Sequence, residues 1–531
     1  MPAIMTSRAR RGSGWIGGIV VPLGLMLATF ASLIVLYRTG QPPLPRYLYD
    51  SDALYLPTLF SDILLHGGRI SDWYLTPAPY FFPDFILYFL AFSLGSDIYL
   101  SILLFSLIQI TVLFIALNYL LEAFLEGRQL LLASVATVLL VWLSVNGGVP
   151  FVFVLSSGFH FSVAISAVVL AGLWLRICDQ DDLSKTKGLM AAACSLSFLL
   201  SLSDDLFLVQ VLVPFIGALA VFGLCTREVV ARRCIAAIGP AAFGLLGSLS
   251  YPYVVANPTR YRPRIDIQGI PTKMVETYSV FAEVIGRFPP AGVLLVAYAV
   301  LLVWVLAATI GRRRVDQASV KVVWLIVFSL LSSACAVLVV LISSGIVATS
   351  RYYIPVFVWP IIVGVVLIGT AAKHGLVRLF TLVASLAVVS LVASAWSRQQ
   401  ERGLASGHYP DEIACIDRAL EAVGLRNGIA GYWDAKHIQA FSRQSITLAQ
   451  YTEHLDEFRW ITSGASFRSS YDFAIISENE PTTEKIPRRA LIAAAGAPEN
   501  EVACGERILL VYGRDRLRLS KRPAGVPEPS R

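Results

Sequence analysis

Charged side chains are scarce in this sequence of 531 residues. Asp, Glu, Lys and Arg together make up only 15% of it, whereas apolar residues make up 56%. Soluble domains carry about 25% charged residues, so most of this chain cannot cover itself with a conventional water-facing surface. Several signatures are also missing: there is no P-loop, no dinucleotide fingerprint, no HExxH and no zinc-type spacing of Cys and His. The chain therefore has no motif for using a cytosolic nucleotide directly.

Long apolar runs dominate what the sequence does contain. They measure roughly 18 to 25 residues, the length of a membrane-spanning helix. The net charge of +7 does not indicate a nucleic-acid partner, because the basic residues cluster at the ends of the apolar runs, as membrane orientation requires. We expect about eleven spans, near residues 14–37, 98–121, 129–146, 160–177, 188–203, 206–225, 234–251, 291–310, 321–345, 354–372 and 376–395.

The first run, 14–37, sets the direction of the chain at its start. It follows Arg8, Arg10 and Arg11, and no small-x-small cleavage site comes after it. Its apolar stretch is also too long for a signal-peptide core. We therefore expect a retained helix with its N-terminus inside.

The segment Tyr80–Leu94 decides the orientation of all later spans. It has only about 15 residues, which is short for a span, and it contains Pro83 and Asp84. If it does not cross, the inside loops collect most of the Lys and Arg, while the short outer loops 147–159 and 203–206 hold none. If it crosses, this bias inverts. The positive-inside rule favours a juxtamembrane or re-entrant segment, and the odd number of spans then leaves the C-terminus outside.

The sequence thus predicts a mainly α fold in two parts. Residues 1–395 form a polytopic transmembrane helical bundle with outer loops at 38–97 and 252–290, and residues 396–531 form a small soluble α/β domain on the outer face. In this tail, β-type runs alternate with helical stretches. The predicted strands are Gly428–Tyr432, Ser445–Leu448, Phe473–Ser477 and Ile508–Tyr512, and the predicted helices are 411–423 and 484–495.

The tail offers two further features. Cys415 and Cys504 are its only cysteines; an outward-facing domain tolerates a disulfide between them, and the alternative is two unpaired buried thiols. Trp433, in the sequence Tyr432-Trp433-Asp434, follows a predicted strand. Its ring either stacks on a sugar or belongs to the core of the tail.

Two carboxylates lie in the first outer loop. Asp50 and Asp52 precede the stretch Leu56–Leu65, whose apolar positions have helical spacing and whose first turn contains Pro57. We expect this stretch to be an amphipathic helix on the membrane surface. One interpretation is that a carboxylate caps the helix. The other is that the pair acts as a general base or binds a metal, since a cap needs only one of them.

Three more polar residues lie at the predicted outer ends of spans. Asp204 and Asp205 form a turn between two apolar helices, and they either belong to a short solvated loop or face a partner within the protein. His160 opens a span and is either a helix-end residue or a catalytic group.

Basic and aromatic residues gather in two outer regions. Arg260 and Arg262 lie among tyrosines after the seventh span; they either bind a lipid phosphate or a sugar or form an interfacial anchor belt. Arg351, followed by Tyr352, lies at the outer end of a later span. An outer Arg runs against the positive-inside bias, which favours phosphate binding.

This arrangement resembles the GT-C superfamily of integral-membrane glycosyltransferases, in particular the bacterial aminoarabinose transferases and the protein mannosyltransferases. The likeness covers about 400 residues and rests on a cytoplasmic N-terminus, an acidic first outer loop with a surface helix, many spans and an outer C-terminal domain. Two motifs strengthen it. Asp50-Ser51-Asp52 resembles the acidic motif of the family, and Ser350-Arg351-Tyr352-Tyr353-Ile354-Pro355, followed by Pro360, is similar to its "RY-x-x-P" entry to a late span. Asp204 and Asp205 have no secure counterpart in the family, and the resemblance does not extend to the tail.

The resemblance implies sugar transfer, with inversion, from a polyprenyl phosphate to an envelope glycan, lipid or protein at the outer face of the inner membrane. Asp50 or Asp52 would deprotonate the acceptor hydroxyl, and Arg351, with Arg260 or Arg262, would neutralise the leaving phosphate. A divalent cation such as Mg²⁺ or Mn²⁺ on the two carboxylates is compatible with oxygen ligands. This mechanism requires Asp50 or Asp52 to share one cavity with Arg351.

Two other classes of protein remain as alternatives. An envelope-polysaccharide polymerase or ligase predicts catalytic Arg and His in a large later loop. A transporter or flippase predicts charged residues deep inside spans and broken helices in paired positions. The predicted spans are nearly free of charge and show no repeat, which favours chemistry at the outer boundary.

Overall fold

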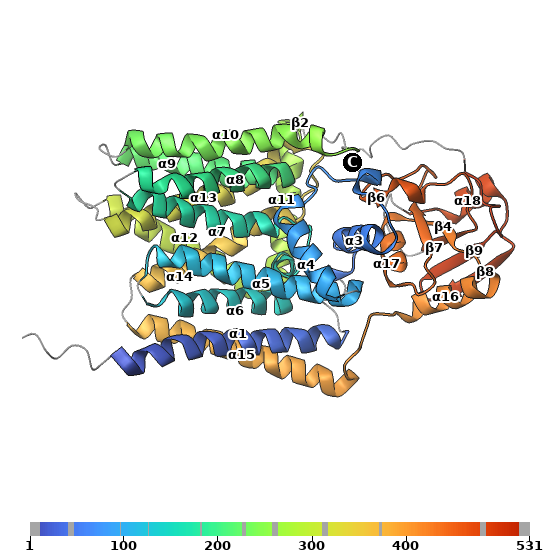
Figure 1. The fold of residues 1–531 in the computed structure, drawn as a ribbon, viewed down its shortest axis with the longest axis horizontal. Coiled ribbons are helices and arrows are strands. Elements are labelled where there is room, and N and C mark those ends of the chain that lie inside the picture. Colours follow the sequence, from blue (N-terminus) through green and yellow to red (C-terminus); the bar gives the residue numbers. More distant parts are fainter. Residues whose placement is uncertain are drawn as a thin grey trace, which may run out of the picture.

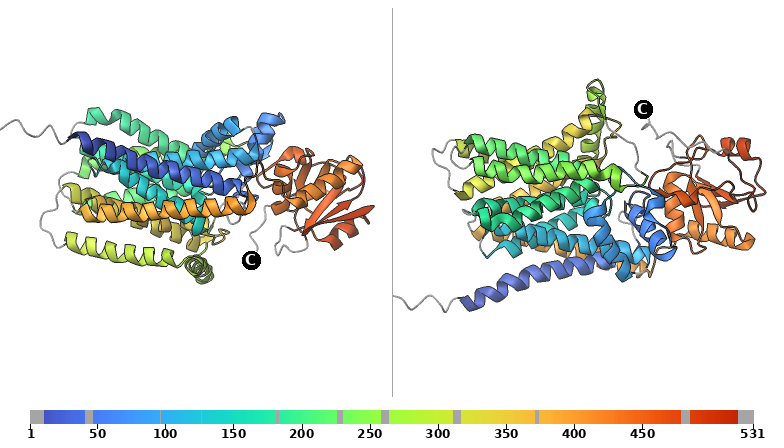
Figure 2. Two further views of the ribbon diagram at one scale, coloured as in Figure 1. Left: turned by 90° about the horizontal axis from the view of Figure 1, so that it is seen from below. Right: turned by 45° about the horizontal axis from the view of Figure 1, so that its top comes forward.

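The structure is a computed structural model. It describes residues 11–519 apart from 41–46, 96, 126, 181–182, 226–229, 258–263, 311–316, 371–373 and 478–484. It is mainly helical, with a bundle of long helices and a smaller part that carries a sheet (Figure 1). The two parts lie end to end, and the views in Figure 2 agree that the second part covers one end of the bundle.

A helix is present at each of the eleven segments predicted to span the membrane. The bundle consists of α1 (Arg11–Arg38), α5 (Ile98–Glu122), α6 (Gln129–Asn146), α7 (Phe161–Asp179), α8 (Lys187–Ser203), α9 (Val213–Cys225), α10 (Val230–Val254), α12 (Pro289–Ile310), α13 (Gln317–Ile342), α14 (Ile354–Thr370) and α15 (His374–Arg402).

Among the described residues, seven helices are long and apolar enough to cross a membrane, or up to 8 if a bent pair counts as one span. That pair is α11 (Ile270–Arg287) with the start of α12, bent by 113°. This count covers the described residues alone, and α8, with 17 residues, is among the shorter apolar helices that it leaves out. Large apolar side chains of the bundle stay exposed, such as Leu245, Val296 and Leu386. The chain is thus built as a multi-pass membrane protein.

A five-stranded sheet organises the tail. Its order is β5-β4-β7-β9-β8. The strands are β4 (Asn427–Ala430), β5 (Thr447–Gln450), β7 (Phe473–Ser477), β8 (Asn500–Cys504) and β9 (Arg507–Val511), and the helices are α16 (Asp411–Val423), α17 (Tyr432–Phe441) and α18 (Arg488–Ala495). β4 pairs in parallel with β5 and β7, whereas β9 is antiparallel to β7 and β8. The predicted strand 473–477 and helix 411–423 have the same bounds in the structure.

Alternation along β7 explains how the sheet is buried on both faces. Phe473 and Ile475 belong to the large core that also includes the bundle, whereas Ala474 and Ile476 belong to a separate core on the other face, together with Leu491 of α18. Successive side chains of a strand point to opposite faces. One face of the sheet therefore packs toward the bundle.

The first outer loop joins the two parts. Its helix α3 (Tyr55–Leu65) contacts both α17 and the α4–α5 pair, α4 being Ile86–Gly95. Its short strand β1 (Trp73–Tyr74) pairs antiparallel with β6 (Thr462–Ser463) of the tail. Hydrogen bonds reinforce this junction, because the Ser51 hydroxyl donates to the carbonyl oxygens of Tyr432 and Trp433 at 2.6 and 3.1 Å.

The helix predicted at 56–65 is present, but the prediction that its apolar face lies on the membrane is wrong for its first two turns. Leu56 and Leu59 are fully buried and Phe60 is 8% exposed, because protein covers this face. Only Leu64 and Leu65 remain exposed. The segment predicted not to cross, 80–94, begins as a π-helical turn (Phe81–Phe85) and continues as α4, one of the shorter apolar helices.

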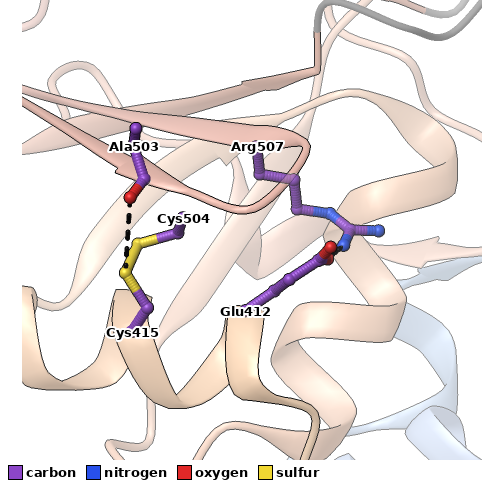
Figure 3. Close-up of a disulfide and its surroundings, with 5 residues drawn as sticks. All are labelled: Glu412, Cys415, Ala503, Cys504 and Arg507. Carbon is purple, nitrogen blue, oxygen red and sulfur yellow. Dashed lines mark hydrogen bonds and ion pairs between the residues drawn. A yellow bond between two sulfur atoms is a disulfide. The ribbon is translucent and has the colours of Figure 1, made fainter.

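A disulfide ties the tail together (Figure 3). Cys415 of α16 bonds to Cys504 at the end of β8, with the two Cα atoms 5.6 Å apart. Beside it, Arg507 of β9 forms an ion pair with Glu412 of α16 and a second one with Asp434 of α17 at 2.6 Å. Of the two interpretations of the tail cysteines, the structure thus shows the bonded pair.

Candidate active site

A cavity of about 710 Å³ lies where the end of the bundle, the first outer loop and the tail meet. This volume is in the range of small-molecule sites. Four groups of residues line it. The first outer loop contributes Asp50, Asp52, Tyr55 and Tyr80; the ends of the bundle helices contribute His160, Asp204, Asp205, Val209, Val339, Arg351 and Tyr352; the connecting segments contribute Val149, Phe153, Ile346 and Val347; and the tail contributes Tyr432, Trp433, Phe458, Trp460 and Ile461.

Asp52 connects all three parts of the protein. Its Oδ2 accepts a hydrogen bond from Nη1 of Arg351 at 2.8 Å, and its Oδ1 accepts one from the hydroxyl of Tyr432. The side chains of Arg351 and Asp52 are 29% and 18% exposed, so the ion pair is largely shielded from water. The structure therefore brings the predicted acidic motif and the predicted phosphate-binding Arg into direct contact.

Asp50 has different surroundings. Its Oδ1 accepts a hydrogen bond from the backbone N–H of Ala53 at 2.7 Å. The residue at the N-cap of α3 is Leu54, which makes no side-chain cap. The alternative that Asp50 or Asp52 caps this helix is therefore wrong.

The two carboxyl groups differ in proton affinity. Burial, together with the neighbouring charge of Asp52, raises the pKa of Asp50 to about 7. Burial also opposes the charged form of Asp52, but Arg351, the hydroxyl of Tyr432 and Lys436 outweigh it and hold the pKa of Asp52 below its usual value. The pair thus consists of one carboxylate that is charged at neutral pH and one that is poised to exchange a proton.

A second network lies beside the first. His160 Nδ1 and Asp204 Oδ2 are 2.5 Å apart, and the hydroxyl of Tyr80 lies 3.3 Å from Nε2 of the same ring. Tyr80 and His160 both have a left-handed backbone, with φ of 59° and 64°. Strained residues of this kind persist only where the surrounding structure fixes them, and they cluster at functional sites. His160 is at the N-cap of α7 but does not cap it with its side chain.

The acidic turn divides into a buried and an exposed residue. Asp204 is 3% exposed, so the interpretation of a simple solvated loop is wrong for it. Its Oδ1 also accepts the backbone N–H of Leu206 at 3.0 Å. Asp205 is exposed, lines the cavity and accepts a hydrogen bond from Ser248 at 2.6 Å.

The remaining predicted residues are placed as follows. The ring of Tyr352 lies 5.5 Å from that of His160 and 5.4 Å from the guanidinium of Arg351. Arg260 and Arg262 lie outside the described residues. Trp433 is half-buried; it lines the cavity and also packs against the large core.

The residues around Asp52 do not match a cation site. Both of its carboxylate oxygens already accept hydrogen bonds, one of them from a guanidinium whose charge opposes a bound metal ion. In the part of the chain that the structure describes, no group of three or more His, Cys, Asp or Glu could hold a metal ion. We therefore assign no step to the Mg²⁺ or Mn²⁺ considered from the sequence.

Sequence reasoning missed several residues of this site. Tyr80 was only the boundary of an ambiguous segment, and nothing in its neighbours indicates that it faces His160. Tyr432 carried a signal, since it stands beside Trp433 after a strand, but only the docking of the tail brings its hydroxyl to Asp52. Phe458 and Trp460 stand in an irregular segment and carried no signal.

Comparison with known proteins adds no relative: no family model matches the chain, and no curated protein is recognisably similar to it. The function is therefore inferred from the residues of the site.

Proposed function

We propose that this protein is an inverting glycosyltransferase of the GT-C type. It moves a sugar from a polyprenyl-phosphate donor to an envelope lipid, polysaccharide or protein at the outer face of the inner membrane. The observation that carries the proposal is the single cavity in which Asp50, Asp52 and Arg351 meet, at the end of a membrane-helix bundle and beneath a second domain. Chemistry of this kind needs a base, a cation for phosphate and access from the membrane.

The proposed topology has eleven spans, an inside N-terminus and an outer tail. Basic residues support it, because they gather at the ends of bundle helices that point away from the tail; described examples are Arg128, Arg176, Lys185, Lys187, Lys321 and Arg378. The disulfide in the tail also supports it, since disulfides persist in oxidising compartments outside the cytoplasm.

The bundle side of the cavity suits a lipid-linked phosphate. Part of its lining is apolar, with Val149, Phe153, Val209, Val339 and Ile346, as a polyprenyl chain requires. Arg351 stands at the same place, and its buried Nε has no hydrogen-bond partner among the described residues. A buried N–H without a partner is costly, and a phosphate oxygen would satisfy it.

Asp50 suits the role of general base better than Asp52. A base works best when its pKa lies near the operating pH, and burial raises the pKa of Asp50 to about 7. Asp52 is held by Arg351 and Tyr432 through both oxygens. Asp52 would then position Arg351, while Asp50 takes the proton.

The reaction balances with these groups alone. Asp50 removes the proton of an acceptor hydroxyl, and the oxygen attacks the anomeric carbon of the donor from the side opposite the phosphate. The bond from the anomeric carbon to the phosphate oxygen breaks, the configuration inverts, and polyprenyl phosphate leaves. Arg351 faces the charge that develops on the phosphate.

Mass spectrometry of envelope lipids, polysaccharides and glycoproteins tests this proposal. A strain without the gene is compared with strains that regain wild-type protein or Asp50→Ala/Asp52→Ala protein at equal level. We expect one sugar to be lost, to return with wild type and to stay absent with the double variant. A matched control is Glu122→Gln, which removes a carboxylate at the opposite end of the bundle and should restore the sugar.

Other outcomes would redirect the function. Loss of polymer length or of a whole polysaccharide would favour a polymerase or ligase. Full restoration by Asp50→Ala/Asp52→Ala would remove the carboxylates from the mechanism. An unchanged glycan profile in the deletion strain would contradict the proposal and favour a transporter or flippase.

A further inference from the structure

The tail contributes an aromatic wall to the cavity, made of Tyr432, Trp433, Phe458 and Trp460. Tyr432 packs edge-on against Trp433 and Phe458, with ring centroids 4.9 and 5.3 Å apart. Tyr432 and Phe458 are buried, whereas Trp433 and Trp460 are half-exposed. The buried ring of Tyr432 thus supports the indole of Trp433, and both indoles are only partly buried where they line the cavity.

The backbone beside Trp460 is held in an unusual conformation. Ile461 has a φ of 44°, in the left-handed region that a β-branched side chain disfavours. It directly precedes β6, whose pairing with β1 fixes Thr462 opposite Tyr74. Strain that the fold maintains at a cavity is a sign of function. Here it places Trp460 and Ile461 on the lining of the cavity.

The catalytic carboxylates lie directly against this wall. Ser51, between Asp50 and Asp52, is fully buried and bonds to the backbone of Tyr432 and Trp433. The bundle end of the cavity contributes the apolar residues Val149, Phe153, Val209, Val339 and Ile346, which the donor lipid would contact. The acceptor is therefore left with the tail side, where flat rings adjoin a proton-accepting carboxylate.

We propose that the aromatic wall is the acceptor subsite and that it takes a pyranose ring. The apolar C–H face of the sugar would lie on Trp433 or Trp460, and one of its hydroxyls would reach Asp50. A bare fatty chain would use the rings but offer no hydroxyl. The acceptor is thus a sugar-bearing molecule, such as a glycolipid or a polysaccharide. This inference rests on the proposed function, because it assigns the second substrate of that reaction.

Saturation-transfer NMR on the full chain in lipid nanodiscs tests the subsite. The probes are the methyl pyranosides of glucose, galactose, mannose and N-acetylglucosamine, with the peptide Ala-Ser-Ala as a sugar-free hydroxyl. We expect saturation of ring protons in at least one glycoside, and a loss of at least about fivefold in Trp433→Ala/Trp460→Ala. Trp433→Phe/Trp460→Phe keeps the flat rings and should retain most of the signal. Trp396→Ala is the matched control, since Trp396 is 63% exposed on α15 and is not part of the cavity.

Three results would overturn the inference. They are no saturation of any glycoside by wild-type protein, equal saturation in the Trp433→Ala/Trp460→Ala protein, and tryptophan-dependent saturation of the peptide alone. The last result would indicate a protein acceptor. Asp50→Asn separates this inference from the proposed reaction, because it should abolish transfer while the dependence of the glycoside signals on Trp433 and Trp460 persists. Normal transfer by that variant would count against the reaction, whereas the tryptophan dependence judges the subsite.

Discussion

The charge of Asp52, together with burial, should influence the pH at which the proposed transfer begins. If Asp50 is the base, transfer requires its deprotonated form. Since the pKa of Asp50 is raised to about 7, kcat/KM should fall below neutral pH, rise through pH about 7 and level off above it. Asp52→Asn removes a negative neighbour of Asp50 and frees the positive charge of Arg351. Both effects stabilise the Asp50 carboxylate and lower its pKa.

Coulomb's law gives the scale of this shift. Two unit charges about 4 Å apart interact by about 4 kcal/mol at an effective dielectric constant of about 20, and the interaction weakens with distance. Arg351, 2.8 Å from Asp52, already cancels part of that repulsion. About 1.4 kcal/mol corresponds to one pKa unit. We therefore expect the acidic limb of the Asp52→Asn profile to move down by about one pH unit, with a lower plateau because Arg351 loses its anchor.

The assay is release of polyprenyl phosphate by membrane vesicles that contain the natural donor, measured from pH 5 to 9 and normalised to each plateau. Glu122→Gln is the control, because it removes one negative charge at the far end of the bundle and should leave the limb in place. An unchanged or upward-shifted midpoint in Asp52→Asn would refute the reasoning. So would a wild-type profile with no acidic limb.

Three further predictions concern Arg351, Tyr432 and the disulfide. Arg351→Ala should lower kcat/KM by about 10² to 10³. Arg351→Lys should retain only part of the wild-type kcat/KM, because Lys keeps the charge but not the planar guanidinium. Full activity of Arg351→Ala, measured as donor turnover, would contradict this role. Tyr432→Phe removes one hydrogen bond to the carboxylate of Asp52, worth about 1.5–3 kcal/mol. Donor turnover should therefore fall about tenfold or more, while the aromatic wall and glycoside binding remain. Unchanged turnover would show that this hydrogen bond does not contribute to the reaction. Cys415→Ser/Cys504→Ser removes a crosslink between residues with a sequence separation of 89 and should destabilise the tail by about 4 kcal/mol. The midpoint of thermal unfolding should fall and proteolysis of the tail should become faster. A midpoint equal to that of wild type would argue against a stabilising crosslink.

The bundle helices and four of the five strands in the sheet of the tail follow from local sequence, whereas β8 and α17 were not predicted. A span such as 129–146 needs only a long apolar run, because backbone groups in lipid must bond within the helix. The strand 473–477 is a short run of buried β-formers, and its bounds are the same in the sequence and in the structure. In contrast, local sequence did not show that α3 packs under protein, since an apolar stripe looks the same whether lipid or the tail covers it.

The site was only partly predictable for a related reason. Asp52 could be singled out because a helix cap needs only one of two neighbouring carboxylates. Arg351 could be singled out because an outer Arg runs against the positive-inside bias. Their contact across a sequence separation of 299 is a product of tertiary packing. Tyr80 and Trp460 carry no local signal at all, because their roles come from the backbone around them and from the docking of the tail. His160 and Asp204 were noted separately, and only the fold pairs them.

Mass spectrometry of lipid-linked sugars tests the central claim most directly. Lipid extracts are compared from wild type, from a strain without the gene and from one that makes Asp50→Asn protein at normal level. The proposed reaction predicts that one polyprenyl-phosphate sugar accumulates in the deletion strain and in the Asp50→Asn strain, and that it falls to its normal level when wild-type protein is restored. Unchanged levels of every polyprenyl-phosphate sugar across these strains, or accumulation that Asp50→Asn relieves as well as wild type does, would contradict it.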